Sequence, residues 1–204
     1  MLVIGVAGGI ASGKSSAAKC FERLGAVVLD ADQIGHQVLC EPSVKQEIFN
    51  HWGGKVFKEE EVDRSALAEI VFESVVGFEL DKLEQITHPI IGQRIADRLA
   101  QLESENVPAV VLDAPVMFKA GWDKFCDKIV FVNADLEVRR QRVAKRGWTA
   151  SQLSRREEQQ VEIETKCSRA TDQIDNVLSE QEFFSEIEAL WHSWRLPVSE
   201  SKPT

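Results

Sequence analysis

The sequence predicts an α/β fold: a parallel sheet of about five strands flanked by helices, with a helical substrate-binding insert and a helical lid. Three observations predict it. A glycine-rich loop joins a buried strand to a helix, later apolar runs end in polar residues, and two long stretches between strands have helical periodicity. With 204 residues, the chain can form one such domain carrying an inserted subdomain.

The glycine-rich loop, residues 8–15, follows the apolar run 2–7 and leads into a predicted helix over 14–24. Its glycines let backbone N–H groups converge at the positive end of a helix, which forms an anion site. Lys14 would reach the β- and γ-phosphates of a nucleoside triphosphate, and Ser15 is placed to bind Mg²⁺. A turn without a ligand is the less favoured alternative. The loop therefore predicts a P-loop NTPase-type sheet whose nucleotide-binding residues are Gly9, Ile10, Ala11, Ser12, Gly13, Lys14, Ser15 and Ser16.

Acidic residues follow two further predicted strands. The run 26–29 ends at Asp30 and Asp32, and the run 108–112 ends at Asp113. Ligands of an open parallel sheet bind beyond the carboxyl ends of its strands, so these acids are expected at the same edge as the loop. They could position Mg²⁺ or accept a proton from a hydroxyl nucleophile. Alternatively, one caps the predicted helix 33–39 and Asp113 caps a turn.

Residues 33–106 interrupt the strand pattern. Helical spacing over 43–52, 64–72 and 80–102 predicts an inserted substrate-binding subdomain, with a possible short strand at 55–57. Pro89 is expected to kink or split the third helix. Arg64 and Arg94 could hold phosphate there, although an exposed arginine on a helix is more often only solvated.

The stretch 138–156 contains seven basic residues and no acid, in a chain of net charge -9. Arg142 and Arg146 are four residues apart and project from one helix face. Thr149 and Gln152 have the spacing of a capping box that starts a second helix. Two basic helices predict a lid that neutralises phosphoryl charge, rather than a plain charged surface. The basic residues are Arg139, Arg140, Arg142, Lys145, Arg146, Arg155 and Arg156.

Composition excludes other classes. The pI of about 5.1 argues against a broad basic surface for nucleic acid. No apolar run has membrane-spanning length, and the N-terminus enters a strand without the pattern of a signal peptide. The four cysteines are scattered, as expected of reduced thiols in a cytoplasmic protein.

The C-terminal part of the chain is expected to form a last short strand at 174–177 and an amphipathic helix over 180–194, followed by a polar tail.

The assembled motifs resemble the dephospho-coenzyme A kinase family over nearly the whole chain, up to about Trp194. The phosphate loop 8–15, Asp-Ala-Asp at 30–32, Asp-Arg-x-x-Leu-Ala at 63–68 and His-Pro at 88–89 are similar to the family pattern. So are the paired lid arginines and Ile-Asp-Asn at 174–176. The loop alone indicates only a nucleotide, whereas the ordered combination is far more specific.

The resemblance implies transfer of the ATP γ-phosphoryl group to the ribose 3′-hydroxyl of dephospho-coenzyme A, the last step of coenzyme A biosynthesis. Its substrates would be ATP and dephospho-coenzyme A, with Mg²⁺, and neither nucleic acid nor a membrane is implied. Asp32 would be the general base or hydroxyl-orienting group. The remaining roles would be phosphate contacts by Lys14, Arg142 and Arg146, metal binding by Ser15, Asp32 and Asp113, acceptor contacts by Arg64 and His88, and adenine contact by Asn176.

The expected organisation has a nucleotide-binding core over 1–32, 107–133 and 170–195, an acceptor subdomain over 33–106, a lid over 134–169 and a flexible tail over 196–204. One departure concerns Lys119, which stands where the family usually has glutamate and reverses a charge near the acceptor crevice. Two rival functions remain at this stage: another P-loop kinase for a small molecule or nucleoside monophosphate, and a non-catalytic ATP-binding relative. The sequence leaves the oligomeric state open.

Overall fold

The structure is a computed structural model that describes residues 1–73, 77–158, 161–176 and 179–196. The chain divides into two compact units, one formed by Met1–Asp30 with Leu99–Thr204 and the other by Ala31–Arg98. We call them the sheet unit and the helical unit. Val177, from the predicted last strand, and tail residues 197–204 lie outside the described residues.

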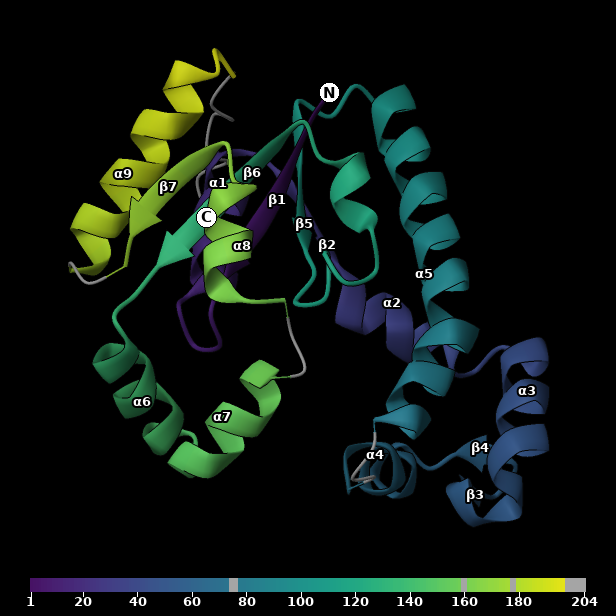
Figure 1. Cartoon of the computed structure of the whole chain (residues 1–204). Helices are drawn as coiled ribbons and strands as arrows, with labels where there is room; N and C mark the ends of the chain where they lie inside the picture. The colour runs from purple at the N-terminus through teal and green to yellow at the C-terminus, as the bar shows by residue number, and fades with distance from the viewer. Residues whose placement is uncertain (74–76, 159–160, 177–178, 197–204) are drawn as a thin grey trace. The chain divides into compact units, whose positions relative to one another are not determined.

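The sheet unit is built on five parallel strands in the order β2-β5-β1-β6-β7 (Figure 1). Their bounds are β1 Leu2–Gly8, β2 Val27–Asp30, β5 Ala109–Asp113, β6 Lys128–Asn133 and β7 Asp172–Asp175. The predicted parallel sheet flanked by helices is therefore confirmed. Because β1 lies at the centre between β5 and β6, the loop that follows it opens at the middle of the sheet's carboxyl edge.

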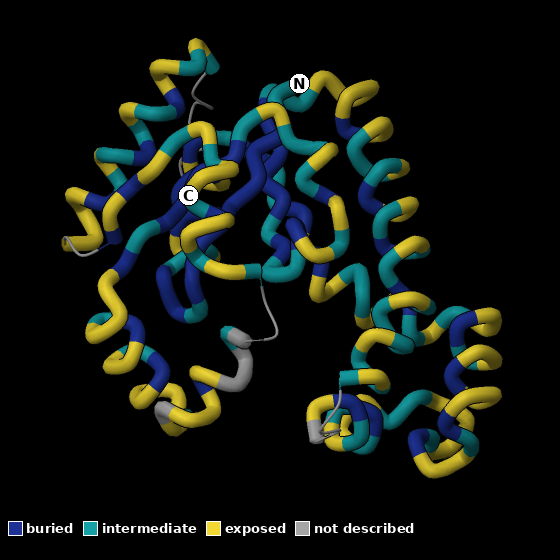
Figure 2. The backbone as a smooth tube through the Cα atoms, in the orientation of Figure 1, coloured by how far each residue is buried: buried dark blue, intermediate teal, exposed yellow. Residues whose placement is uncertain are grey.

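The strands are apolar on both faces because helices and loops cover both faces of a parallel sheet. Figure 2 shows the strands of this unit as mostly buried, and the four residues Ala109–Leu112 of β5 have no exposed surface. Helices α1 (Lys14–Leu24) and α9 (Glu180–Ser193) pack together, and their apolar residues join those of the strands in one core. Phe21 of α1 and Trp191 of α9 are fully buried in it. α8 (Ile163–Ser168) also packs against β1.

Besides α8, two further helices of the predicted lid, residues 134–169, belong to the sheet unit. They are α6 (Leu136–Lys145) and α7 (Ala150–Glu158). The capping box at the start of α7 is present: the Gln152 backbone donates to Thr149 Oγ1 at 3.2 Å, and the Thr149 backbone donates to Gln152 Oε1 at 2.8 Å. A short 3₁₀ helix, η2 (Trp122–Phe125), follows β5.

In the described part of the helical unit, four α-helices lie within the unit or begin there, and a small hairpin follows the second of them. The helices are α2 (Ala31–Val38), α3 (Pro42–Trp52), α4 (Arg64–Glu73) and α5 (Phe78–Ser104), and a 3₁₀ helix, η1 (Gly53–Val56), precedes the hairpin strands β3 (Phe57–Lys58) and β4 (Glu61–Val62). The expected strand at 55–57 was thus wrong for Lys55 and Val56. Gly53 and Gly54 allow a tight 3₁₀ turn there, and pairing starts only at Phe57.

α5 runs without interruption through Pro89, so of the expected kink or split the split is wrong. A proline inside a helix removes one backbone N–H donor, but packing can outweigh that loss. Here the buried Ile91 and Ile95 follow on the same helix, and Thr87 Oγ1 donates to the carbonyl of Leu83 one turn earlier at 2.8 Å.

Candidate active site

The phosphate loop closes tightly between β1 and α1. Gly13 has φ 109°, in the left-handed region that favours glycine. A Cβ atom added there would lie 1.8 Å from Asn176 Nδ2, so the position also requires glycine for space. Asn176, directly after β7, donates from Nδ2 to the Ser12 carbonyl at 2.7 Å. The loop is therefore braced by a residue more than 160 positions away in the sequence.

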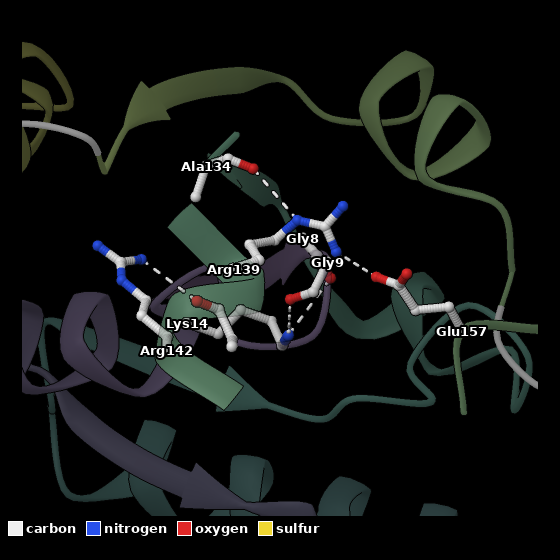
Figure 3. A network of polar contacts seen from close by, with 8 residues as sticks. Gly8, Gly9, Lys14, Ala134, Arg139, Arg142 and Glu157 are labelled. Carbon is white, nitrogen blue, oxygen red and sulfur yellow. Dashed lines mark hydrogen bonds and ion pairs between the residues drawn. The ribbon is translucent and has the colours of Figure 1, made fainter. Parts of the chain in front are cut away.

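Lys14 folds back over the loop. Its ammonium donates to the carbonyls of Gly9 at 2.8 Å and Gly8 at 3.3 Å (Figure 3). The pKa of Lys14 is lowered to about 8, mainly by burial and also by the positive charge of Lys166, while the charge of Asp113 opposes the shift. Burial removes water from the Lys14 ammonium, and a bound anion can replace the hydrogen bonds that water would otherwise make to it.

Ser15 and Asp113 meet at the sheet's carboxyl edge. Ser15 Oγ, in the first turn of α1, donates to Asp113 Oδ2 at 3.1 Å. Burial raises the pKa of Asp113, while the bond from Ser15 and the charge of Lys14 lower it. Asp30 ends the neighbouring strand in register with Asp113. The sequence prediction that a strand-end acid lies beside the loop serine is borne out for Asp113 by this bond.

These oxygens fit a magnesium ion in their chemistry, since Mg²⁺ binds through one or two protein oxygens, phosphate and water. Ser15 and Asp113 supply a hydroxyl and a carboxylate oxygen close together. Among the described residues there is no group of three or more metal-binding side chains, so a full protein cage is absent from that part of the chain. Two protein ligands suit a site that is completed by phosphate oxygens and water.

Arg142 reaches from α6 to the loop. Its Nη1 donates to the Ser12 carbonyl at 3.0 Å and the Ala11 carbonyl at 3.2 Å, and Nη2 donates to the Asn176 carbonyl at 2.9 Å. Its expected place beside the loop is observed. Arg146, four residues on, is exposed and lies just after the last residue of α6. Its charge also helps to lower the pKa of Lys14.

Arg139 makes a second link between lid and loop. It is buried, donates from Nε to the Ala134 carbonyl at 3.2 Å, and forms an ion pair with Glu157 of α7 (Figure 3). A Cβ atom added to Gly9 would lie 2.8 Å from its Nη1, so the guanidinium packs directly against the loop backbone. Sequence reasoning grouped Arg139 with the lid cations but gave Glu157 no part.

Lys166 of α8 is the main site residue that sequence reasoning missed. It is 4% exposed and lines one small cavity with Gly8 and Lys14. A lone lysine in a short helix carries no local signal, so only the packing of α8 on β1 reveals it. The side chains of Arg155 and Arg156, in the predicted lid cluster, lie outside the described residues.

The remaining candidates belong to the helical unit. Asp32 is the second residue of α2 and exposed, so it lies in the first turn and the expectation that this helix begins at residue 33 was wrong. Arg64 is the first residue of α4 and lines a pocket of about 350 Å³ with Lys58. His88 is half-buried in α5. Arg94, a further predicted phosphate contact, forms an ion pair with Glu41 at 2.9 Å.

We compared the chain with known protein families. The family model described as dephospho-CoA kinase matches residues 2–182. The chain belongs to the dephospho-CoA kinase family. It is therefore a kinase, and the rival of a P-loop kinase from another family is set aside.

Individual relatives match this chain over nearly their whole length. A dephospho-CoA kinase of Geobacter sulfurreducens is 37% identical over 194 residues, covering 94% of this chain and 98% of that protein. A crystal structure from Thermus thermophilus matches with a TM-score of 0.78 and 30% identity, covering 94% of this chain and 97% of that one. Dephospho-CoA kinase from Campylobacter jejuni matches with a TM-score of 0.71 and 28% identity, covering 94% and 96%.

Lys119, the departure noted in the sequence, is exposed in the turns after β5, next to the buried Phe118. Family membership stands despite this reversed charge. In the described part of this family member, none of the helices is long and apolar enough to cross a membrane.

Proposed function

We propose that this kinase transfers the γ-phosphoryl group of ATP to the ribose 3′-hydroxyl of dephospho-coenzyme A, giving coenzyme A and ADP. The observation that carries the proposal is the loop at the end of β1, with a lysine over its carbonyls and a serine–carboxylate pair beside it. Family membership supports the choice of acceptor. The alternative function, a relative that binds ATP without transferring phosphate, is tested by the assay below.

The nucleotide phosphates would bind to the backbone N–H groups of the loop residues 9–16 and to Lys14. Ser12 supports this: its hydroxyl is buried in the loop and has no hydrogen-bond partner among the described residues. By the family resemblance, Asn176 would lie near the adenine; its side chain is bonded to the loop at the Ser12 carbonyl. Transfer of a phosphoryl group needs little covalent help, so positioning and charge neutralisation dominate its rate.

Ser15 and Asp113 would hold Mg²⁺, whose chemistry is to neutralise charge on the β- and γ-phosphates. Asp32 is a further metal candidate by its position two residues after β2. In the same proposal Asp32 orients the attacking 3′-hydroxyl and accepts its proton as the oxygen–phosphorus bond forms and the bond to ADP breaks.

Arg142 and Arg146 would complete the phosphate site from the lid, residues 134–169. Arg142 is anchored on the loop carbonyls, which supports a role in holding loop and nucleotide in register. Arg146 is exposed at the end of α6, where a guanidinium can turn toward phosphoryl oxygens that gain charge.

The acceptor would bind to the helical unit, through Arg64 and His88. The pocket at Arg64 supports this, because an arginine at the start of a helix can bind a phosphate with its side chain and the helix N-terminus together.

The proposed place of action is the reducing cytoplasm. The four cysteines are free thiols, which supports this location.

The test is release of ADP by the purified protein with Mg·ATP and dephospho-coenzyme A, with nucleoside monophosphates and shikimate as competing acceptors. Turnover with dephospho-coenzyme A alone is expected, and mass spectrometry of the product locates the new phosphate on the 3′-oxygen. Transfer to another acceptor, or ATP binding without any transfer, would refute the proposal. In the second case Lys119→Glu would be the first variant to make.

A further inference from the structure

One buried arginine joins the lid helices α6 and α7 to each other and to the phosphate loop. Arg139 of α6 is 6% exposed, which is unusual for an arginine because burial removes water from its charge. Its Nη1 forms an ion pair with Glu157 of α7, and its Nε donates to the carbonyl of Ala134, between β6 and α6, at 3.2 Å (Figure 3). These two partners hold the guanidinium in place.

The side chain of Arg139 lies against Gly9 of the loop. A Cβ atom added to Gly9 would lie 2.8 Å from Nη1, 3.0 Å from Cζ and 3.2 Å from Cδ of Arg139. The φ of Gly9 is not positive, so its φ does not itself require glycine. Because Glu157 and Ala134 hold the guanidinium, Arg139 leaves little room for any side chain at this position.

The carbonyl of Gly9 is held by other groups. It accepts hydrogen bonds from the Lys14 ammonium at 2.8 Å and from the backbone N–H of Ser12 at 3.2 Å. In a planar trans peptide, the carbonyl of Gly9 and the N–H of Ile10 point in opposite directions. Contacts that fix the Cα and the carbonyl of Gly9 therefore also fix the direction of the Ile10 N–H, and N–H groups of such a loop bind phosphate.

Apolar packing attaches the lid to the loop independently of this ion pair. Ala11 of the loop, Val143 of α6 and Leu153 of α7 are buried in one cluster, and Ile10 and Trp148 pack against it. Loss of the ion pair should therefore leave α6 and α7 docked on the loop. Its effect should be local, at the peptide of Gly9.

We propose that Arg139 is a positioning residue of the phosphate site, which holds Gly9 in its binding conformation and is itself held by Glu157. The inference rests on the proposed kinase function for the identity of the ligand, the triphosphate of ATP. Arg139 acts through the loop backbone, since its Nη1 and Nε already bond to Glu157 and to the Ala134 carbonyl.

Glu157→Ala distinguishes this role from a simple effect of charge. By charge alone, removal of an acid near a phosphate site strengthens the binding of an anion. Loss of the partner that holds Arg139 predicts the opposite: affinity for the β,γ-imido analogue of ATP, measured by calorimetry at fixed Mg²⁺, should fall about tenfold, as for a lost charge-assisted hydrogen bond. Glu157→Gln should lose less, because its amide oxygen can still accept from Arg139. Unchanged or increased affinity in Glu157→Ala overturns the inference.

A double-mutant cycle separates Arg139 from the other cation beside Glu157. Burial lowers the pKa of Lys166 and the charge of Glu157 opposes this shift, so Glu157 also acts on that lysine. Arg139→Met should weaken the analogue about tenfold, and Glu157→Ala added to it should weaken it little further, since both changes break one contact. If the two losses of affinity added in full, Glu157 would act independently of Arg139 and the inference would be overturned.

Gly9→Ala tests the contact with the loop. The added Cβ should displace Arg139 and weaken binding of the analogue, and the same change should cost much less affinity in an Arg139→Ala background. An equal loss in both backgrounds would contradict the inference. Arg140→Met is the control for loss of one positive charge from α6, because Arg140 is exposed and lies 3.9 Å from Glu137; it should bind the analogue as wild type does.

Dephospho-coenzyme A is the second probe, and thermal unfolding checks that each variant is folded. Affinity for dephospho-coenzyme A should stay unchanged in the Arg139 and Glu157 variants, since the proposed function assigns the acceptor to the helical unit. Equal weakening of both probes would indicate a general disturbance and overturn the inference. Failure of wild-type protein to phosphorylate dephospho-coenzyme A would refute the proposed function, while titration with the imido analogue still decides the role of Arg139.

Discussion

Ser15 Oγ donates a hydrogen bond of 3.1 Å to Asp113 Oδ2 and so joins the first turn of α1 to the end of β5. The two residues are 98 positions apart in the sequence. They meet because β5 lies next to β1 in the sheet, and both strands end at the same edge. This pair provides the oxygens that we assign to the metal.

Ser15→Ala should therefore impair the use of magnesium. We expect the dependence of the initial rate on Mg²⁺ to shift to higher concentration and kcat/KM for ATP to fall at least about tenfold, because a metal ligand and its hydrogen bond are lost. Ser185→Ala is the matched control, since this exposed serine of α9 bonds only to a carbonyl of its own helix among the contacts described. An unchanged magnesium dependence in Ser15→Ala would exclude Ser15 as a ligand.

The lowered pKa of Lys14, about 8, predicts an alkaline limit to ATP binding. Below this pH the ammonium is charged and can bind phosphate. As the pH rises through 8, the free enzyme loses that charge, so kcat/KM for ATP should fall. Bound phosphate favours the ammonium, so the decline in kcat should occur at higher pH. In Lys14→Arg the guanidinium stays charged, and the decline should disappear; a decline that persists unchanged would assign it to another group.

The lowered pKa of Lys14 affects stability in the opposite direction: it predicts a free energy of unfolding that increases with pH, whereas ATP binding weakens. Between pH 8 and 10.5 the unfolded chain keeps a proton on Lys14 that the folded protein has released. The contribution of Lys14 to the free energy of unfolding therefore rises with pH across this interval. Denaturant unfolding of wild type and Lys14→Met at several pH values measures it. We expect any stability advantage of the variant to shrink toward alkaline pH, and an advantage that grows with pH would contradict the assignment.

Arg142→Ala should reduce kcat/KM at least about tenfold, because the guanidinium bonds to two loop carbonyls and to Asn176 and is expected to face phosphoryl charge. Arg140→Ala is the control on the same helix. Arg140 is exposed and lies 3.9 Å from Glu137, a surface pair that contributes little. Steady-state kinetics of both variants test this prediction. If kcat/KM of Arg142→Ala equalled that of Arg140→Ala, Arg142 would have no role in catalysis.

Asp32→Asn should lower kcat far more than it weakens ATP binding, since we assign the carboxylate chiefly to the hydroxyl nucleophile, while the loop and Lys14 hold the nucleotide phosphates. Asp97→Asn is the matched control in the helical unit. Asp97 is exposed and accepts a hydrogen bond from Gln93 at 2.8 Å, which an amide oxygen can still accept. Wild-type turnover by Asp32→Asn would remove Asp32 from both proposed roles.

The sequence by itself determined the sheet and the loop. The loop glycines, the apolar runs and the helix over 14–24 are local patterns, and the structure has them where they were predicted. The capping box at Thr149 was found in the same way, because its partners are three residues apart. Pro89 shows the limit of local rules, since packing of α5 outweighed one missing donor.

Tertiary structure alone decided which side chains meet at the loop. Arg142 was predicted from a charge cluster, but its bonds to Ala11 and Ser12 depend on how α6 packs after β6. The link of Arg139 to Glu157 and the place of Lys166 beside Lys14 depend on how α6, α7 and α8 pack, which no local motif specifies. Charge and burial act through space, so residues distant in sequence become one electrostatic site only when strands and helices bring them together.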